Sequence, residues 1–289
     1  MPSRALARRS VRGWLFAAWC AAAAGARVPD ERALLGEVPS VFAASKYDQP
    51  LSEAPADVSI VTRAEIQRYG WLTLADILRG VRGFLVTSDR NYSYAGGRGC
   101  AHTGDYNERI LLTVDGHRVN DSIYDQAHGT QKTLGGNTVE DSSDGLLVNV
   151  NSDEAIGCGI EAEIDGRSGF GLELFATATT QFGDTAVGSP RTQVKGRLAQ
   201  SFAGERATVA LESFFQTART TLAGTVVPAQ TLTNLVFAAQ KFWKGLRLAA
   251  VVQIVFDTTL ADPAGSEHRQ DRIPSPGRQF LLQLDYAFQ

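Results

Sequence analysis

The segment Phe280-Leu281-Leu282-Gln283-Leu284-Asp285-Tyr286-Ala287-Phe288 alternates in side-chain character with a period of two. Because successive side chains of a β-strand point to opposite faces of a sheet, one face of this segment carries only large apolar side chains. The other face carries Leu281, Gln283, Asp285 and Ala287. This segment therefore predicts a strand that separates an apolar environment from a more polar one.

The same alternation recurs through residues 156–289, where we expect about seven antiparallel strands. Residues 246–256 place six apolar side chains on one face and Arg247 and Gln253 on the other, and residues 207–216 divide in the same way. Further candidate strands are residues 160–164, 170–180, 192–200 and 231–240. Segments of this length and pattern are typical of an outer-membrane β-barrel. A soluble β-sandwich also alternates and is the alternative for this half.

The N-terminal half predicts a small α/β unit. A β-rich run at residues 58–61 precedes Thr62-Arg63-Ala64-Glu65, which has the pattern of a capping box at a helix start. We expect this helix to end at Gly70, because glycine readily adopts the left-handed conformation that terminates helices. Thr73 can cap a second short helix, which we expect to end at Gly80.

Strands and turns follow these helices. Residues 84–86 and 109–114 are strand-like, and Asp115-Gly116 is a strong signal for a two-residue hairpin turn. A glycine-rich stretch between them, residues 91–99, is expected to be a loop. It lacks the strand-to-helix setting and the Lys-Ser/Thr ending of a phosphate-binding loop.

Taken in order, these elements resemble the plug domain of TonB-dependent outer-membrane receptors. The matching segments are Gln49-Pro50-Leu51-Ser52-Glu53-Ala54-Pro55, Val58-Ser59-Ile60-Val61-Thr62, the helix that ends at Gly70, Leu74-Ala75-Asp76-Ile77-Leu78, Arg98-Gly99 and Leu111-Leu112-Thr113-Val114-Asp115-Gly116. The resemblance implies an α+β plug domain followed by antiparallel strands of a truncated outer-membrane β-barrel. An ordinary soluble α/β domain is the alternative for this half.

The resemblance divides the chain into four parts. Residues 1–26 are expected to be a signal peptide, because four arginines precede an apolar run and a small-residue cleavage site at Ala26. An N-terminal membrane anchor is the alternative. Residues 27–45 are an N-terminal segment, residues 46–150 a plug domain with a degenerate C-terminal part, and residues 156–289 a partial barrel.

A closed ring of seven strands is too narrow for a plug. Strands about 4.8 Å apart and tilted by about 40° each take about 6.3 Å of circumference, so seven close to a diameter of about 14 Å. A domain of about 100 residues is more than about 30 Å across. We therefore expect that an internal deletion, marked by the polar stretch at residues 130–144, removed the late plug and most of the barrel.

Two candidate sites follow from the resemblance. Glu37, Val38, Pro39, Ser40 and Val41 are the candidate TonB-interaction segment, which could pair with TonB as an added strand. Its alternative is a tail that enters the plug.

The glycine-rich loop supplies the second site, in which Tyr92, Tyr94 and Arg98 are the candidate ligand contacts. Packing and plug–barrel hydrogen bonds are the alternative roles of these side chains.

Composition limits the other functions. The formal net charge is −3, and loss of the four arginines of the signal peptide makes it −7 (−3 − 4), so we expect no nucleic-acid binding.

Cys100 and Cys158 could form a disulfide in an oxidising periplasm or serve as small apolar residues. The four histidines have no metal-ligand spacing with each other or with cysteine, and no nucleophile–base pair stands out. We expect no enzyme, no metal and no cofactor.

The resemblance implies a TonB-dependent receptor-like transporter for a scarce ligand such as a siderophore or cobalamin. The expected partners are the TonB energy-transducing complex, outer-membrane lipid and the barrel assembly machinery, which recognises a terminal aromatic residue such as Phe288. The expected location is the cell outer membrane, or the periplasm if the barrel cannot close. The alternatives are a non-transporting periplasmic plug-type interaction module and a non-functional gene remnant. The ligand and the oligomeric state stay open.

Overall fold

The computed structural model describes residues 40–41, 49–50, 58–101, 107, 110–115, 117–120, 137–140, 147–150, 157–183, 185–204, 206–243 and 245–286. The chain divides into two compact units, Met1–Val58 and Ser59–Gln289. In the first unit, β1 (Ser40–Val41) pairs antiparallel with β2 (Gln49–Pro50). All further elements belong to the second unit.

Both predicted helices form and both begin with a capping box. In α3 (Arg63–Tyr69), the Glu65 amide donates to Thr62 Oγ1 at 3.2 Å and the Thr62 amide donates to Glu65 Oε2 at 3.0 Å. The helix ends at Gly70, whose φ of 63° is left-handed, as predicted. Thr73 and Asp76 make the same reciprocal bonds at the start of α4 (Leu74–Gly80).

The glycine-rich stretch predicted to be a loop is partly a strand. β3 (Leu85–Ser88) pairs antiparallel with β4 (Ser93–Gly96), which corrects the prediction of a loop over residues 91–99. Asp89 closes the intervening turn, because its Oδ1 accepts the amides of Asn91 at 2.8 Å and Tyr92 at 2.6 Å.

The hairpin predicted at Asp115 forms between β5 (Thr113–Val114) and β6 (His117–Arg118), with Asp115 at a φ of 51°. Its strands are shorter than predicted because the Asn120 side chain takes the place of ladder bonds. Its Oδ1 accepts the Leu112 amide at 2.7 Å and its Nδ2 donates to the Ile110 carbonyl at 2.8 Å. Another hairpin joins β7 (Asn137–Glu140) to β8 (Leu147–Val150).

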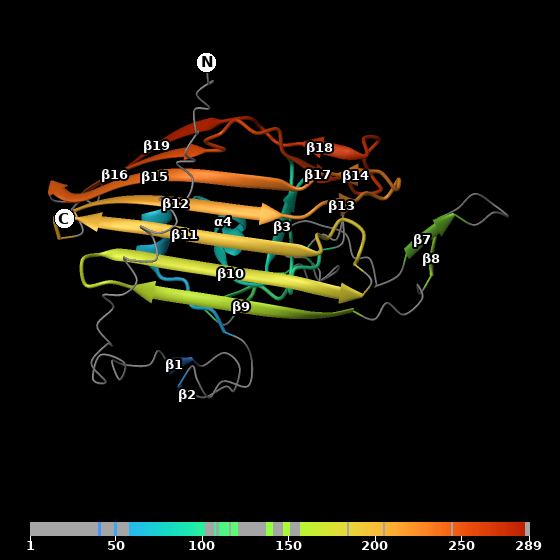
Figure 1. Ribbon diagram of the computed structural model, residues 1–289, viewed down its shortest axis with the longest axis horizontal. Coiled ribbons are helices and arrows are strands. Elements are labelled where there is room, and N and C mark those ends of the chain that lie inside the picture. Colours follow the sequence, from blue (N-terminus) through green and yellow to red (C-terminus); the bar gives the residue numbers. More distant parts are fainter. Residues whose placement is uncertain are drawn as a thin grey trace, which may run out of the picture. The chain divides into compact units, whose positions relative to one another are not determined.

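The prediction of seven antiparallel strands is confirmed. They form one sheet in which each strand pairs with the next one of the set (Figure 1). The strands are β9 (Gly157–Arg167), β10 (Leu172–Gly183), β11 (Thr192–Phe202), β12 (Ala207–Gln216), β15 (Gln230–Trp243), β16 (Leu246–Gln253) and β19 (Gln279–Tyr286). Among the described strands, β9 and β19 each have one neighbour. The predicted strand at 246–256 is too long, because Ile254 has a φ of 53° and the chain leaves the sheet there.

Two small hairpins occupy the connections at one end of this sheet. β13 (Arg219–Thr220) pairs with β14 (Val226–Val227), and β17 (Ala261–Pro263) pairs with β18 (Arg272–Pro274). Both lie at the end of the sheet at which the β3–β4 hairpin stands (Figure 1). The Asp262 carboxylate of β17 links β13 to β3. It accepts a hydrogen bond from Arg219 Nη2 at 2.7 Å and another from the Ser88 amide at 2.9 Å.

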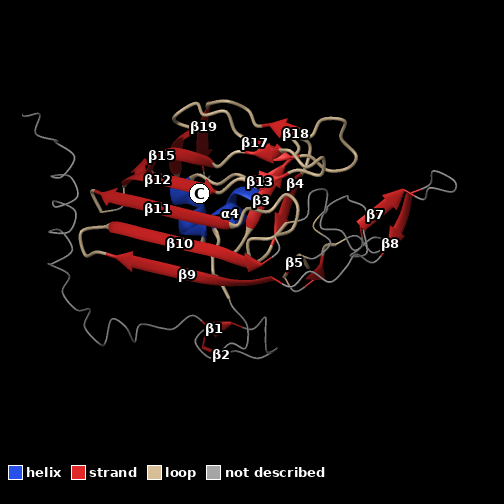
Figure 2. Ribbon diagram, turned by 45° about the vertical axis from the view of Figure 1, so that its right-hand side comes forward, coloured by secondary structure: helices blue, strands red, loops and turns tan. Residues whose placement is uncertain are grey.

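The two faces of the sheet differ, as the alternation predicted. On β12, Ala210 and Glu212 are buried, whereas Leu211 between them is 41% exposed. The helices lie against the buried face (Figure 2). The core there consists of Tyr69, Trp71, Ala199, Ala210, Val236 and Val251. No helix among the described residues is long and apolar enough to cross a membrane.

We expect Gly70→Ala to destabilise the protein more than Gly204→Ala. Both glycines have a similar positive φ, 63° and 67°, so alanine meets a similar backbone strain of about 1–2 kcal/mol at each. A Cβ at position 70 would lie 2.7 Å from Val251 Cγ2, whereas nothing lies within 4 Å at position 204. Urea denaturation should show an additional loss of about 1–3 kcal/mol in the free energy of unfolding for Gly70→Ala. Equal losses would contradict the packing of the α3 end on β16.

Candidate functional site

The face of the sheet that meets the α/β segment (residues 58–120) carries buried charged side chains. Lys195 and Arg197 of β11 and Glu212 of β12 are 4%, 7% and 2% exposed. A buried charge without a partner is strongly destabilising, so the α/β segment has to supply partners for these groups.

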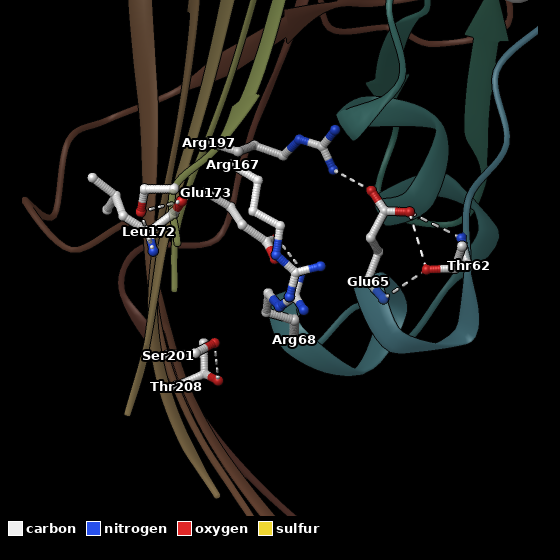
Figure 3. A network of polar contacts seen from close by, with 10 residues as sticks. Thr62, Glu65, Arg68, Arg167, Leu172, Glu173, Arg197, Ser201 and Thr208 are labelled. Atoms are coloured by element: carbon white, nitrogen blue, oxygen red, sulfur yellow. Dashed lines mark hydrogen bonds and ion pairs between the residues drawn. The ribbon is translucent and has the colours of Figure 1, made fainter. Parts of the chain in front are cut away.

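Arg197 is held by a carboxylate and three aromatic rings. Its Nη1 lies 3.7 Å from Glu65 Oε1, and Figure 3 shows the two side chains reaching toward each other from the sheet and from α3. The guanidinium lies 3.9 Å from the Phe175 ring centroid, 5.1 Å from that of Tyr69 and 5.3 Å from that of Trp71. A planar and weakly hydrated guanidinium suits this setting better than an ammonium. Burial raises the pKa of the Tyr69 hydroxyl to about 12.

Two glutamates of the sheet receive donors from the α/β segment. Glu212 accepts the indole N–H of Trp71 at 2.9 Å. Glu173 of β10 is paired with Arg68 of α3 and with Arg167 of β9, the latter at 3.0 Å (Figure 3). These bonds hold the C-terminal end of α3 against β10 and β12.

Cations of the sheet are bound by backbone carbonyls of the α/β segment. Lys195 Nζ donates to the carbonyls of Val81 and Phe84, both at 2.6 Å, in the connection from α4 to β3. Arg247 of β16 donates to the carbonyl of Gln67 in α3. The sheet thus binds the helical layer through side chains from β10, β11, β12 and β16.

The three predicted ligand contacts are only partly brought together. Tyr92 and Tyr94 line one cavity of about 300 Å³ within the α/β segment, beside Asn107 and Leu74. Arg98 is exposed and does not line this cavity. A second cavity, of about 220 Å³, lies between α4 and the inner face of the sheet.

The Tyr94 hydroxyl is engaged in a contact with a distant loop. It donates to Asp89 Oδ2 at 2.6 Å and lies 3.4 Å from Glu267 Oε1, while His268 Nε2 lies 3.2 Å from the same Asp89 oxygen. Burial and the bond to Asp89 raise the pKa of Tyr94. Burial works to raise the pKa of Asp89, but the bonds from Tyr94, from two backbone amides and from His268 outweigh it and lower this pKa. These bonds agree with the alternative role given to Tyr94.

Several sequence predictions fall wholly or partly outside the described residues. Ser40 and Val41 form β1, whereas Glu37, Val38 and Pro39, the signal peptide at residues 1–26 and Phe288 lie outside them. Cys100 and Cys158 are free cysteines, and the Cys100 thiol donates to Gln181 Oε1 at 3.1 Å.

We expect Glu212→Leu to be far more damaging than Glu212→Gln. Glutamine keeps an acceptor for the Trp71 indole, whereas leucine leaves that buried N–H unpaired, at a cost of about 1–3 kcal/mol. Urea denaturation followed by tryptophan fluorescence measures both losses. If the two variants lost equal stability, the Trp71–Glu212 bond would not be what joins these layers.

Comparison with known proteins gives one family. Residues 50–144 match the TonB-dependent Receptor Plug Domain. A relative, the vitamin B12 transporter BtuB of Vibrio vulnificus strain CMCP6, is 32% identical over 84 residues. This match covers 28% of this chain and 13% of BtuB, so the chain spans a small part of that relative's length.

Solved structures match over about half of this chain. FpvA of P. aeruginosa bound to a pyoverdine is 18% identical, covers 45% of this chain and 19% of its own, and gives a TM-score of 0.36. The ferric-catecholate import receptor Fiu of E. coli K12 is 15% identical, and the match covers 53% of this chain and 24% of Fiu with a TM-score of 0.40. The FrpB iron transporter of Neisseria meningitidis is 16% identical, and the match covers 52% of this chain and 26% of FrpB with a TM-score of 0.41. Residues 50–144 of this chain, which include its α/β segment, are therefore similar to the plug domain of TonB-dependent receptors.

Proposed function

We propose that this protein acts in the outer membrane as a TonB-coupled receptor, with the seven-stranded sheet as a lipid-facing wall and the plug domain on its inner side. The observation that carries the proposal is the opposite chemistry of the two faces of the sheet. On the outward face, Leu211 of β12, Phe237 of β15 and Leu282 of β19 are 41%, 45% and 75% exposed. In water, such a contiguous apolar surface would be an aggregation hazard.

The inner face supports the same proposal. It carries charged groups that the plug partners, namely Lys195, Arg197 and Glu212. A wall that is apolar outward and polar inward is the arrangement of a membrane-spanning barrel. A soluble sandwich would instead bury its apolar face against a second sheet.

The proposed ligand and partners rest on the similarity to TonB-dependent receptors. The relative BtuB is a vitamin B12 transporter, which supports a scarce ligand of the cobalamin or siderophore type as the cargo. Ser40 and Val41 already form a strand, β1, which supports strand addition to TonB by the segment from Glu37 to Val41. The signal peptide, outer-membrane lipid and the barrel assembly machinery complete this proposal, in which the protein performs no catalysis.

The sheet edges favour a second candidate, a non-transporting plug-type module. Among the described strands, β9 and β19 each leave one edge without a partner. Lipid does not tolerate open sheet edges, so a lone seven-stranded sheet cannot be a finished barrel. An internal deletion near residues 130–144 would explain this state, and the product would then reside in the periplasm or be a gene remnant.

Leu211→Arg and Leu222→Arg separate a lipid-facing sheet from a soluble one. The two leucines are similarly exposed, at 41% and 46%, but Leu211 lies in mid-strand and Leu222 lies in the turn between β13 and β14. A lipid-facing arginine costs about 2–4 kcal/mol near the bilayer centre. We expect Leu211→Arg to lower the amount of protein that stays in urea-washed outer membranes, and Leu222→Arg to leave it unchanged.

If both variants fractionate like the parent in the membrane, the outward face does not contact lipid. If the parent is recovered only from the periplasm, the receptor proposal fails and the plug-type module replaces it.

A further inference from the structure

We propose that this protein holds one divalent transition-metal cation of the zinc class between its plug and the β17–β18 connection, with Asp89, Glu267 and His268 as ligands. The cation would act as a clamp between two segments far apart in sequence. The inference does not depend on transport, because it concerns a bound ion and not the organic cargo.

The three donor atoms already lie at coordination distances from one another. Asp89 Oδ2 lies 3.2 Å from His268 Nε2, which in turn lies 3.7 Å from Glu267 Oε1, and all three atoms lie within 4.8 Å of one another. Ligands bound to zinc at about 2.0–2.1 Å in a tetrahedron are separated by about 3.3–3.4 Å. A cation therefore needs only small side-chain movements to bind all three.

The Asp89 carboxylate is fixed before any ion arrives. Its side chain is 5% exposed, and its Oδ1 accepts the amides of Asn91 and Tyr92. The Tyr94 hydroxyl donates to Oδ2 at 2.6 Å. Such bonds orient metal-binding carboxylates in known sites and strengthen their affinity. Tyr94 is thus a positioning residue for this site.

The opposite side of the site comes from a turn held by its own backbone. The His268 amide donates to the Gly265 carbonyl at 3.1 Å, and the Ala264 amide donates to the Asp271 carbonyl at 3.1 Å. These bonds shape the turn that carries Glu267 and His268, whose donor atoms lie within 4.8 Å of that of Asp89. The neighbouring cation Arg90 is directed elsewhere, because its Nε donates to the Pro274 carbonyl at 2.8 Å.

The donor set selects the class of ion. One imidazole nitrogen and two carboxylate oxygens suit zinc and similar first-row ions, whereas calcium takes six to eight oxygens. Two carboxylates balance the charge of a divalent cation. Glu267 is partly exposed, at 41% for its side chain, which leaves room for a water as the fourth ligand.

The test is zinc titration of the purified full chain in detergent after treatment with a chelator. Isothermal titration calorimetry with zinc chloride should give one site per chain. Cobalt(II) in its place should give the visible absorption of a tetrahedral site. His268→Gln and Asp89→Asn should weaken binding by more than about 100-fold, because a neutral amide replaces an imidazole ligand in one and a charged carboxylate ligand in the other. Tyr94→Phe should weaken it by about 10- to 100-fold.

His117→Gln is the matched control, because His117 lies exposed on the β5–β6 hairpin and outside the site. It should bind zinc like the parent, and circular dichroism should show all variants folded. Binding that survives both His268→Gln and Asp89→Asn, or an absence of binding in the parent, would overturn the proposal. Neither result would bear on membrane insertion, so failure of the clamp and failure of the receptor proposal are distinguishable.

Discussion

The structure depends on the need to neutralise charges buried on the inner face of the sheet. Lys195, Arg197 and Glu212 are almost fully removed from water, and each would strongly destabilise the fold without a partner. The plug supplies two backbone carbonyls, one carboxylate and one indole N–H to these three groups. The buried charges of the sheet therefore require the plug as their partner.

The outward face completes this division of chemistry. Exposed apolar side chains lie along the outward side of the strands, and under the receptor proposal they would contact lipid. In the described sheet, β9 and β19 each leave one edge without a strand partner. These two edges decide whether the sheet can exist in a membrane. Additional strands must close the wall, whether they come from other copies or from elsewhere, or the sheet cannot persist in a bilayer.

Local patterns were predictable from the sequence, and contacts between distant segments were not. The capping residues predicted where α3 and α4 begin, and the period of two predicted which side of β12 is buried. Both patterns act within a few residues of the chain. The strand β4 was missed because its turn depends on the side chain of Asp89, and the end of β16 was missed because nothing local marks the left-handed Ile254. The Asp89–His268 contact joins residues 179 apart, and histidine spacing along the chain could not reveal it.

Under the receptor proposal, one face of the sheet meets lipid while the other meets the plug. A cysteine scan along β12 tests it directly, in chains with Cys100 and Cys158 replaced, by labelling isolated outer membranes with a lipid-soluble and a water-soluble maleimide. We expect positions 209, 211 and 215 to react only with the lipid-soluble reagent, and positions 208, 210 and 212 to react poorly with both. Efficient reaction of positions 209, 211 and 215 with the water-soluble reagent would contradict it.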